Sequence, residues 1–286
     1  MRFGVIDVGS NSVRLMLSEN GHTLKKEIII TRLAEGLAET WRLSENAINR
    51  TISAIGTLKR NAEHAGVSAL YVFATAAVRS AKNGSEFVQR TLMEQNVLIE
   101  VIDGATEAQI GLLGALGNRE GGVLDIGGAS SELIVSLNGK IVYEYSLNLG
   151  AVRLLDLCGQ SREALSQLIG ERIKEYGSVP SVPLTAIGGT ATSIASVDLK
   201  LEPYDPLRVD GHVLMKERLS SLVELLFSLS VEERKSLKGL QPQRADVIAG
   251  GALLLLSIME YLQLSEITVS ERDNLEGFLL RKTDHE

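Results

Sequence analysis

The 286-residue chain contains the pattern Asp-x-Gly twice, each time directly after an apolar segment, at Asp7-Val-Gly9 and Asp125-Ile-Gly127. Glycine lets backbone N–H groups approach an anion closely, and successive amides in a tight turn form an anion-binding nest. A carboxylate beside such a nest repels phosphate unless a hard cation lies between them, and Mg²⁺ prefers one or two carboxylates together with phosphate oxygens. One such loop would be an ordinary turn. Two at matching steps predict a cleft that binds phosphate and magnesium.

The two loops belong to a longer internal repeat. At a constant offset of 118 residues, residues 7–21 and 125–139 share Asp, Gly, Ser, Leu, Ser, Asn and Gly, which makes seven identical positions. In each copy a strand enters the loop, a second strand leaves it, and an Asn-Gly turn typical of hairpins leads into a third strand. The repeat therefore predicts two lobes, each of which opens with a three-stranded meander.

Helical patterns alternate with short strands after each meander. We expect two α/β lobes of the actin-like type, each with a mixed five-stranded sheet flanked by helices, around a central cleft. The first lobe covers residues 1–117 and the second covers 118–274, and a C-terminal helix within 275–286 packs back on the first. The elements expected in detail are helices at 44–65, 85–93, 106–116, 150–157, 161–176, 215–229, 244–262 and 275–281, and strands at 70–74, 98–102, 184–187 and 267–269.

Composition narrows the class of protein. Hydrophobic residues make up 44% and charged residues 23% of the chain, and the formal net charge is −7. Residues 1–117 hold 12 basic and 12 acidic side chains, so the negative balance lies in the second part. No basic run interleaved with aromatic residues is present, which disfavours nucleic-acid binding. The longest apolar run, residues 247–259, is too short to span a bilayer, and we expect a soluble, cytoplasmic protein without a membrane partner.

Eight motifs in a fixed order resemble the exopolyphosphatase / guanosine pentaphosphate phosphatase family, which lies in the actin-like fold group. They are Asp7-Val-Gly-Ser-Asn-Ser-Val-Arg-Leu15, Ala74-Thr-Ala-Ala-Val-Arg-Ser-Ala-Lys-Asn83, Ile102-Asp-Gly-Ala-Thr-Glu-Ala108, Asp125-Ile-Gly-Gly-Ala-Ser-Ser-Glu-Leu133, Ser146-Leu-Asn-Leu-Gly-Ala-Val-Arg-Leu154, Ile187-Gly-Gly-Thr-Ala-Thr-Ser-Ile-Ala195, Arg244-Ala-Asp-Val-Ile248 and Ser270-Glu-Arg-Asp-Asn-Leu-Glu-Gly277.

The resemblance implies a role for each matching residue. Glu107 matches the glutamate that positions or deprotonates the attacking water, and Arg79 matches the arginine that reaches the phosphate chain. The carboxylates associated with Mg²⁺ and the scissile phosphate match Asp7, Asp125 and Glu132. The phosphate-loop residues match Asn11, Ser12, Gly127, Gly128, Ser130 and Ser131. In the wider fold group a glycine-rich turn approaches the purine of ATP, which makes Gly188, Gly189 and Thr190 candidate nucleotide contacts.

Each of these residues also has a purely structural interpretation. Glu107 near a helix N-terminus would favour the helix dipole, Arg79 would cap the helix that follows, and Gly188–Thr190 would be an ordinary tight connection. Asp246 would either fix Arg244 through an ion pair or contact ligand. The chain also departs from many relatives, with Thr106 in place of an acidic residue and Gln109 in place of an arginine.

The expected function is that of a Mg²⁺-dependent phosphohydrolase that releases terminal phosphate from polyphosphate or from guanosine pentaphosphate. The alternatives are a sensor that binds polyphosphate or an alarmone without turnover, and an ATP-using kinase of the same fold group. Longer relatives carry further C-terminal domains that extend a positive channel. The sequence shows no cluster of basic residues that would replace them, so we expect a preference for short chains, and a homodimer is one way to supply a channel.

Overall fold

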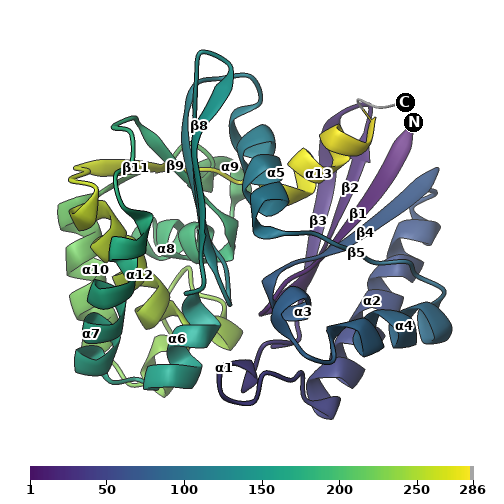
Figure 1. Ribbon diagram of the computed structural model, residues 1–286, viewed down its shortest axis with the longest axis horizontal. Coiled ribbons are helices and arrows are strands. Elements are labelled where there is room, and N and C mark those ends of the chain that lie inside the picture. The colour runs from purple at the N-terminus through teal and green to yellow at the C-terminus, as the bar shows by residue number, and fades with distance from the viewer. Residues whose placement is uncertain (284–286) are drawn as a thin grey trace.

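The computed structural model describes residues 1–283 and shows two α/β lobes side by side (Figure 1). The first lobe is built on a five-stranded sheet with the order β3-β2-β1-β4-β5. Its strands are β1 (Arg2–Val8), β2 (Ser12–Glu19), β3 (His22–Ile30), β4 (Ala69–Ala74) and β5 (Glu100–Val101), and its helices are α1 (Leu37–Thr40), α2 (Glu45–His64), α3 (Ala76–Ser80), α4 (Gly84–Gln95) and α5 (Gly104–Leu116).

The second lobe is built on a six-stranded sheet with the order β10-β11-β9-β6-β7-β8. Its strands are β6 (Gly121–Ile126), β7 (Ser131–Leu137), β8 (Lys140–Leu147), β9 (Leu184–Ile187), β10 (Val213–Met215) and β11 (Glu266–Val269). Its helices are α6 (Ala151–Cys158), α7 (Arg162–Arg172), η1 (Ile173–Tyr176), α8 (Gly188–Asp198), α9 (Pro206–Val209), α10 (Lys216–Ser228), α11 (Val231–Arg234), η2 (Pro242–Arg244) and α12 (Ile248–Tyr261), and α13 (Asn274–Thr283) follows.

The internal repeat has a geometric counterpart in the two meanders. Asp7 of β1 lies opposite Arg14 of β2, and Asp125 of β6 lies opposite Glu132 of β7, which is the same step in each copy. The Gly9 amide donates to the Ser12 carbonyl at 3.0 Å, and the Gly127 amide donates to the Ser130 carbonyl at 3.0 Å. The predicted duplication of strand, loop and strand is therefore confirmed down to the hydrogen bond that closes each loop.

Alternation along the strands gives each sheet two buried faces. In the first lobe, Ile6 and Leu15 pack against α2, whereas Val5, Met16 and Phe73 pack against α13. In the second lobe, one face packs against α7, α8, α10 and α12, while residues of α5 cover the opposite face around Val123, Ile134 and Ile187.

Helices α5 and α13 lie side by side between the two sheets and join the lobes (Figure 1). Their backbones approach so closely that a Cβ placed on Gly277 would lie 1.7 Å from the Ile110 carbonyl oxygen. The ring of Phe278 stacks on Phe73 with centroids 4.4 Å apart, which fixes α13 to the first sheet. The C-terminal helix thus packs on the first lobe over the residues described, and residues 284–286 of the predicted segment lie outside the described part.

Three expectations need correction. The second sheet has six strands, because Val213–Met215 adds a short antiparallel edge strand to β11 that no clear alternation pattern announces. The helix expected at 161–176 ends at Arg172 and tightens into a 3₁₀ turn, and the one expected at 244–262 begins at Ile248. Within residues 1–283, no helix is both long enough and apolar enough to cross a membrane.

Candidate active site

A cavity of about 80 Å³ lies between the lobes, where β1 and β6 end in their loops. Both Asp7 and Asp125 line it, so the structure brings the two repeated carboxylates into one site from opposite walls. Of the other residues singled out from the sequence, those that line the cavity are Asn11, Ser12, Glu107, Gly127, Gly128, Ser130, Gly188, Gly189 and Thr190.

The two glycine-rich loops touch each other across the cleft. A Cβ on Gly128 would lie 2.7 Å from the Ser10 side chain and 3.3 Å from the Asn11 amide nitrogen, so only glycine permits this approach. The carbonyls of Ser10 and Asn11 accept hydrogen bonds from residues 31–34, and those of Gly127 and Gly128 accept from the first amides of α6. Both loops thereby turn carbonyl oxygens away from the cavity, an arrangement suited to presenting amides to an anion.

Asp7 is buried and bonded on one side only. The Nε and Nη2 atoms of Arg14 both donate to Asp7 Oδ2, at 3.1 and 2.5 Å, while Asp7 Oδ1 has no partner among the described residues. The Nη1 atom of Arg14 donates instead to Asp273 Oδ2. Burial raises the pKa of Asp7 above its ordinary value, and the Arg14 guanidinium opposes that rise.

Asp125 is held by the first residue of α13. The side-chain amide of Asn274 donates to its Oδ2 at 2.8 Å. Gly188, with a φ of +81°, lies against Oδ1, where a Cβ would come within 2.4 Å. Burial, and then the charge of Glu132, raise the pKa of Asp125 to about 8. A bound cation would stabilise the ionised form of this carboxyl group.

Glu107 lies in the first turn of α5, whose N-cap is Asp103. Its Oε2 accepts a hydrogen bond from Arg79 at 3.0 Å, and Arg79 also donates to the Ile102 carbonyl at 2.9 Å. Burial, and then the charge of Glu132, raise the pKa of Glu107 well above its ordinary value, while Arg79 lowers it. A carboxylate with a raised pKa that faces a cavity has the chemistry of a general base.

Arg79→Gln is expected to move the acidic limb of the pH–kcat/KM profile to higher pH. The Arg79 cation favours the charged carboxylate, so its removal raises the pKa of Glu107 further. The deprotonated base then appears only at higher pH. Steady-state rates between about pH 5 and 9 measure the shift, and Arg90→Gln, at an exposed ion pair on α4, serves as the matched control. An acidic limb that stays in place would contradict the coupling.

Three of the predicted site residues do not line the cavity, namely Ser131, Glu132 and Arg79. Ser131 is fully buried on the opposite face of β7, and its hydroxyl donates to the Leu149 carbonyl and bonds the Tyr176 hydroxyl, each at 2.9 Å. This corrects the prediction that Ser131 contacts phosphate, because side chains alternate along a strand and Glu132 takes the cleft side. Glu132 and Arg79 lie just behind Glu107, and Ser146 donates to Glu132 Oε1 at 2.7 Å.

The side chain of Arg244 packs against the glycine turn at the start of α8. A Cβ placed on Gly189 would lie only 2.5 Å from a guanidinium nitrogen of Arg244, so the arginine fills the space beside this glycine. Arg244 is buried, lines the cavity, and makes one long bond from Nε to Gln241 Oε1, at 3.3 Å. Burial and the nearby Arg14 cation lower the pKa of Arg244 to about 10. Nucleotide contact by Gly188–Thr190 stays a prediction.

Asp246 pairs across the cleft rather than with its neighbour in the motif. Its Oδ2 lies 2.7 Å from Arg32 Nη1, and Arg32 Nη2 donates to the Gln243 carbonyl at 3.1 Å. The ion pair with Arg244 expected from the sequence is therefore not the contact observed, and contact of Asp246 with ligand stays a prediction. Instead the pair ties the first lobe to the segment that carries Arg244.

Sequence reasoning missed the cavity residues Arg14, Asn274 and Arg244 and the neighbouring Asp273. The alternation of β2 already places Arg14 on the side of Asp7, and that signal was present in the repeat. Asp273 and Asn274 lie within the motif at residues 270–277 but more than a hundred positions from the carboxylates they serve, so the motif does not show what they contact.

The donor set fits a magnesium ion that arrives with its substrate. No cluster of three or more His, Cys, Asp or Glu side chains suited to a metal occurs in residues 1–283. Mg²⁺, however, usually takes one or two carboxylates, with substrate phosphates and water as its other ligands. The unpartnered Oδ1 of Asp7 and the cavity-facing Asp125 supply two carboxylates of that kind.

Comparisons with known proteins identify several similar chains. A model of the Ppx/GppA phosphatase family matches residues 15–286. Exopolyphosphatase 2 of Mycobacterium tuberculosis is 28% identical over 98% of both chains. A bifunctional 3-dehydroquinate synthase/phosphatase of Fusobacterium nucleatum is 29% identical over 98% of this chain, which spans 46% of that protein. The crystal structure of the Ppx/GppA family member from Aquifex aeolicus matches with a TM-score of 0.81 and 28% identity, over 100% of this chain and 98% of the other.

Proposed function

The chain belongs to the Ppx/GppA phosphatase family, and on that premise we propose that it is a phosphohydrolase that releases terminal phosphate groups from polyphosphate. The observation that carries the proposal is the convergence of two carboxylates and a candidate base on one cavity. Asp7, Asp125 and Glu107 all line the cavity between the two glycine-rich loops. Carboxylates that can hold Mg²⁺, loop amides that can bind an anion and a glutamate that can activate water are the groups that phosphate hydrolysis requires.

Phosphoryl transfer asks a protein mainly for positioning and charge stabilisation. The amides of the two loops and the Arg14 and Arg244 guanidinium groups supply positive character around the cavity. Glu107 faces the same space, with its carboxylate orientation fixed by Arg79. In the proposed reaction the terminal phosphoryl group lies between the loops, and Glu107 orients a water and takes its proton. The water oxygen bonds to the terminal phosphorus as the bridging P–O bond breaks, and orthophosphate and the shortened chain are released.

We propose Mg²⁺ as the cofactor, held by Asp7 and Asp125 together with substrate oxygens. The ion would neutralise the charge of the scissile phosphate, which two carboxylates would otherwise repel. Glu132 lies one strand from Asp125 and has one buried oxygen, Oε2, without a partner in the described chain. Its place behind the cavity suits a role in orienting the ligands or a bound water.

A second cavity of about 270 Å³ adjoins the first and favours guanosine pentaphosphate as a second substrate. Arg14, Gly188, Gly189 and Arg244 line both cavities, and Tyr204 lines the larger one. Its volume suits a nucleoside beside the phosphate site. Three basic and three acidic side chains line it, namely Arg14, Lys26, Arg244, Glu27, Glu271 and Asp273. Their formal charges balance, so this cavity adds no net positive charge for a long polyanion, and we propose that short chains are preferred.

A phosphate-release assay tests the proposal on short polyphosphate, long polyphosphate, guanosine pentaphosphate and ATP, each with Mg²⁺ and with EDTA. We expect orthophosphate from short polyphosphate at the highest kcat/KM, lower rates from guanosine pentaphosphate, and loss of activity with EDTA. Binding of polyphosphate without release would identify a sensor instead. Turnover of ATP only when an acceptor is added would identify a kinase. Undiminished rates in EDTA would exclude the magnesium proposal.

A further inference from the structure

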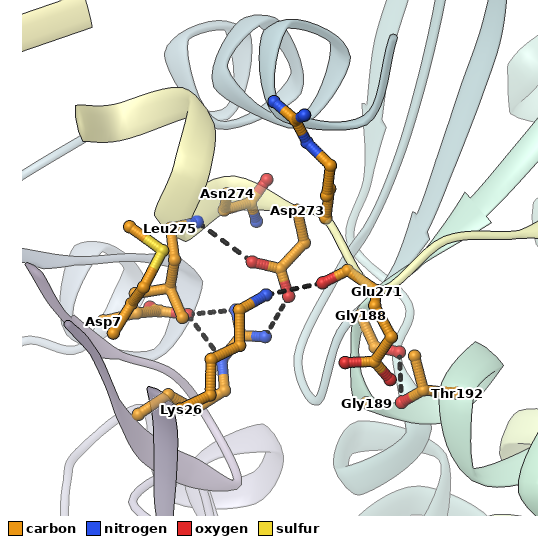
Figure 2. A network of polar contacts seen from close by, with 12 residues as sticks. Asp7, Lys26, Gly188, Gly189, Thr192, Glu271, Asp273, Asn274 and Leu275 are labelled. Carbon is orange, nitrogen blue, oxygen red and sulfur yellow. Dashed lines mark hydrogen bonds and ion pairs between the residues drawn. The ribbon is translucent and has the colours of Figure 1, made fainter. Parts of the chain in front are cut away.

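Two consecutive residues where the chain passes from β11 into α13 are linked to the two cleft carboxylates, one through Arg14 and one directly. Asp273 accepts a hydrogen bond from Arg14, the partner of Asp7, and Asn274 donates to Asp125. Figure 2 shows Asp7, Asp273 and Asn274 converging where this segment meets the first lobe. Both residues are buried, and Asn274 lines the catalytic cavity while Asp273 lines the larger cavity beside it.

We propose that Asp273, acting through Arg14, and Asn274, acting directly, are positioning residues that keep one oxygen of each cleft carboxylate bonded and leave the other oxygen free for ligand. The inference rests on the proposed phosphohydrolase function, and it assigns these two residues to the geometry of the site rather than to contact with substrate.

Asp273 acts through the geometry of the Arg14 guanidinium. A guanidinium edge normally binds a carboxylate through two parallel hydrogen bonds, one to each oxygen. Here Nε and Nη2 of Arg14 both donate to Oδ2 of Asp7, and Oδ1 is left without a partner. The second carboxylate, on Asp273, holds the opposite edge of the guanidinium through Nη1. Without that contact Arg14 is free to turn and cover both oxygens of Asp7.

Asn274 orients the carboxylate on the second wall. Its side-chain amide donates a hydrogen bond to Oδ2 of Asp125, so Oδ1 faces Gly188 and the cavity. Because Asn274 begins α13, which is fixed to the first sheet by Phe278, the contact ties a carboxylate of the second lobe to the first. Both repeated carboxylates are thereby oriented by one rigid point of the fold.

Asp273 also has a structural role, and the two roles can be separated. Its Oδ1 accepts the Leu275 amide at 3.0 Å, and its own amide donates to Glu276 Oε2 at 3.0 Å, and these two bonds cap the N-terminus of α13. Serine caps a helix about as well as aspartate but is too short to reach Arg14, whereas alanine does neither. Asp273→Ser therefore removes the Arg14 contact and the negative charge near Lys26 but keeps the cap, and Asp273→Ala removes the cap as well.

The experiment compares Asp273→Ser, Asp273→Ala and Asn274→Ala with the unchanged chain on short polyphosphate and Mg²⁺. We expect all three variants to lose about tenfold or more in kcat, because misplacing a reacting group by about 1 Å is enough for such a loss. KM is expected not to rise for the Asp273 variants, since a negative charge leaves the neighbourhood of an anionic substrate. The melting temperature is expected to fall further for Asp273→Ala than for Asp273→Ser. A loss of kcat confined to Asp273→Ala would assign Asp273 to the cap alone and overturn its positioning role.

Crystal structures of Asp273→Ser and Asn274→Ala test the inference independently of turnover. We expect Arg14 to engage both oxygens of Asp7 in the first variant and the Asp125 carboxylate to rotate in the second. Unchanged placement of both carboxylates would overturn the proposal even if the enzyme is active. Absence of phosphate release by the unchanged chain, with these rotations present, would instead refute the proposed function and leave the positioning intact.

Discussion

Glu107→Gln is expected to lower kcat on short polyphosphate by ~10²–10⁴-fold, the range typical for loss of a general base. Glutamine keeps the shape of the side chain and an oxygen that accepts from Arg79, but it cannot take a proton. Because Glu107 is held by α5 and Arg79 rather than by the phosphate loops, KM should change little, and kcat and kcat/KM should fall together. Steady-state phosphate release measures the split.

The same substitution is expected to leave the fold intact or to stabilise it. The raised pKa of Glu107 means that the folded state disfavours its charge. Folding stability is therefore reduced at every pH where the side chain is ionised in the unfolded chain. Glutamine removes that charge, so thermal unfolding should occur at the same or a higher temperature. Glu144→Gln, at an exposed glutamate bound to Gln109 of α5, is the matched control. Full activity in Glu107→Gln would contradict its role as base.

Much of the fold was predictable because the chain repeats a strand–loop–strand unit. Two Asp-x-Gly loops at a constant offset implied two similar lobes, and the register confirms it, with Asp7 opposite Arg14 and Asp125 opposite Glu132. The short apolar runs that enter and leave the first loop made β1 and β2 recognisable as strands. The sixth strand of the second sheet was not, since three residues carry too little pattern to distinguish a strand from a loop.

The site residues on the two glycine-rich loops were predictable from the sequence. Those that other segments of the chain bring to the cleft were not. Ser131 shows the limit of matching motifs without strand geometry, because the residue is in the right loop but faces the core. Asp273 and Arg244 show another limit. Both belong to motifs that the sequence shows, but they approach the cleft through contacts between segments far apart in the chain, and a motif does not report which distant residues its members will contact.

Two buried arginines, Arg234 and Arg244, differ in how fully their guanidinium groups are hydrogen-bonded. Arg234 is buried with three acceptors around it, the Leu226 and Ala245 carbonyls and Gln160 Oε1, at 2.6, 3.3 and 2.6 Å. Arg244 is buried in the cavity wall with one long bond to Gln241 and no ion pair among the described residues. An uncompensated buried charge destabilises a fold. The natural reason to keep Arg244 is an anion that supplies the missing partner.

Arg244→Met is therefore expected to raise the melting temperature while it weakens substrate binding. Methionine fills a similar volume without a charge to desolvate, which favours the folded state. A charge-assisted hydrogen bond to phosphate contributes about 1.5–3 kcal/mol, so KM should rise by roughly 10–100-fold. Arg234→Met should do the reverse, lowering the melting temperature and leaving KM in place, because its guanidinium bonds carbonyls and not ligand. Calorimetric unfolding and steady-state kinetics on the two variants measure both effects. A fall in stability with unchanged KM for Arg244→Met would show that Arg244 is a structural residue like Arg234 and that the anion binds elsewhere.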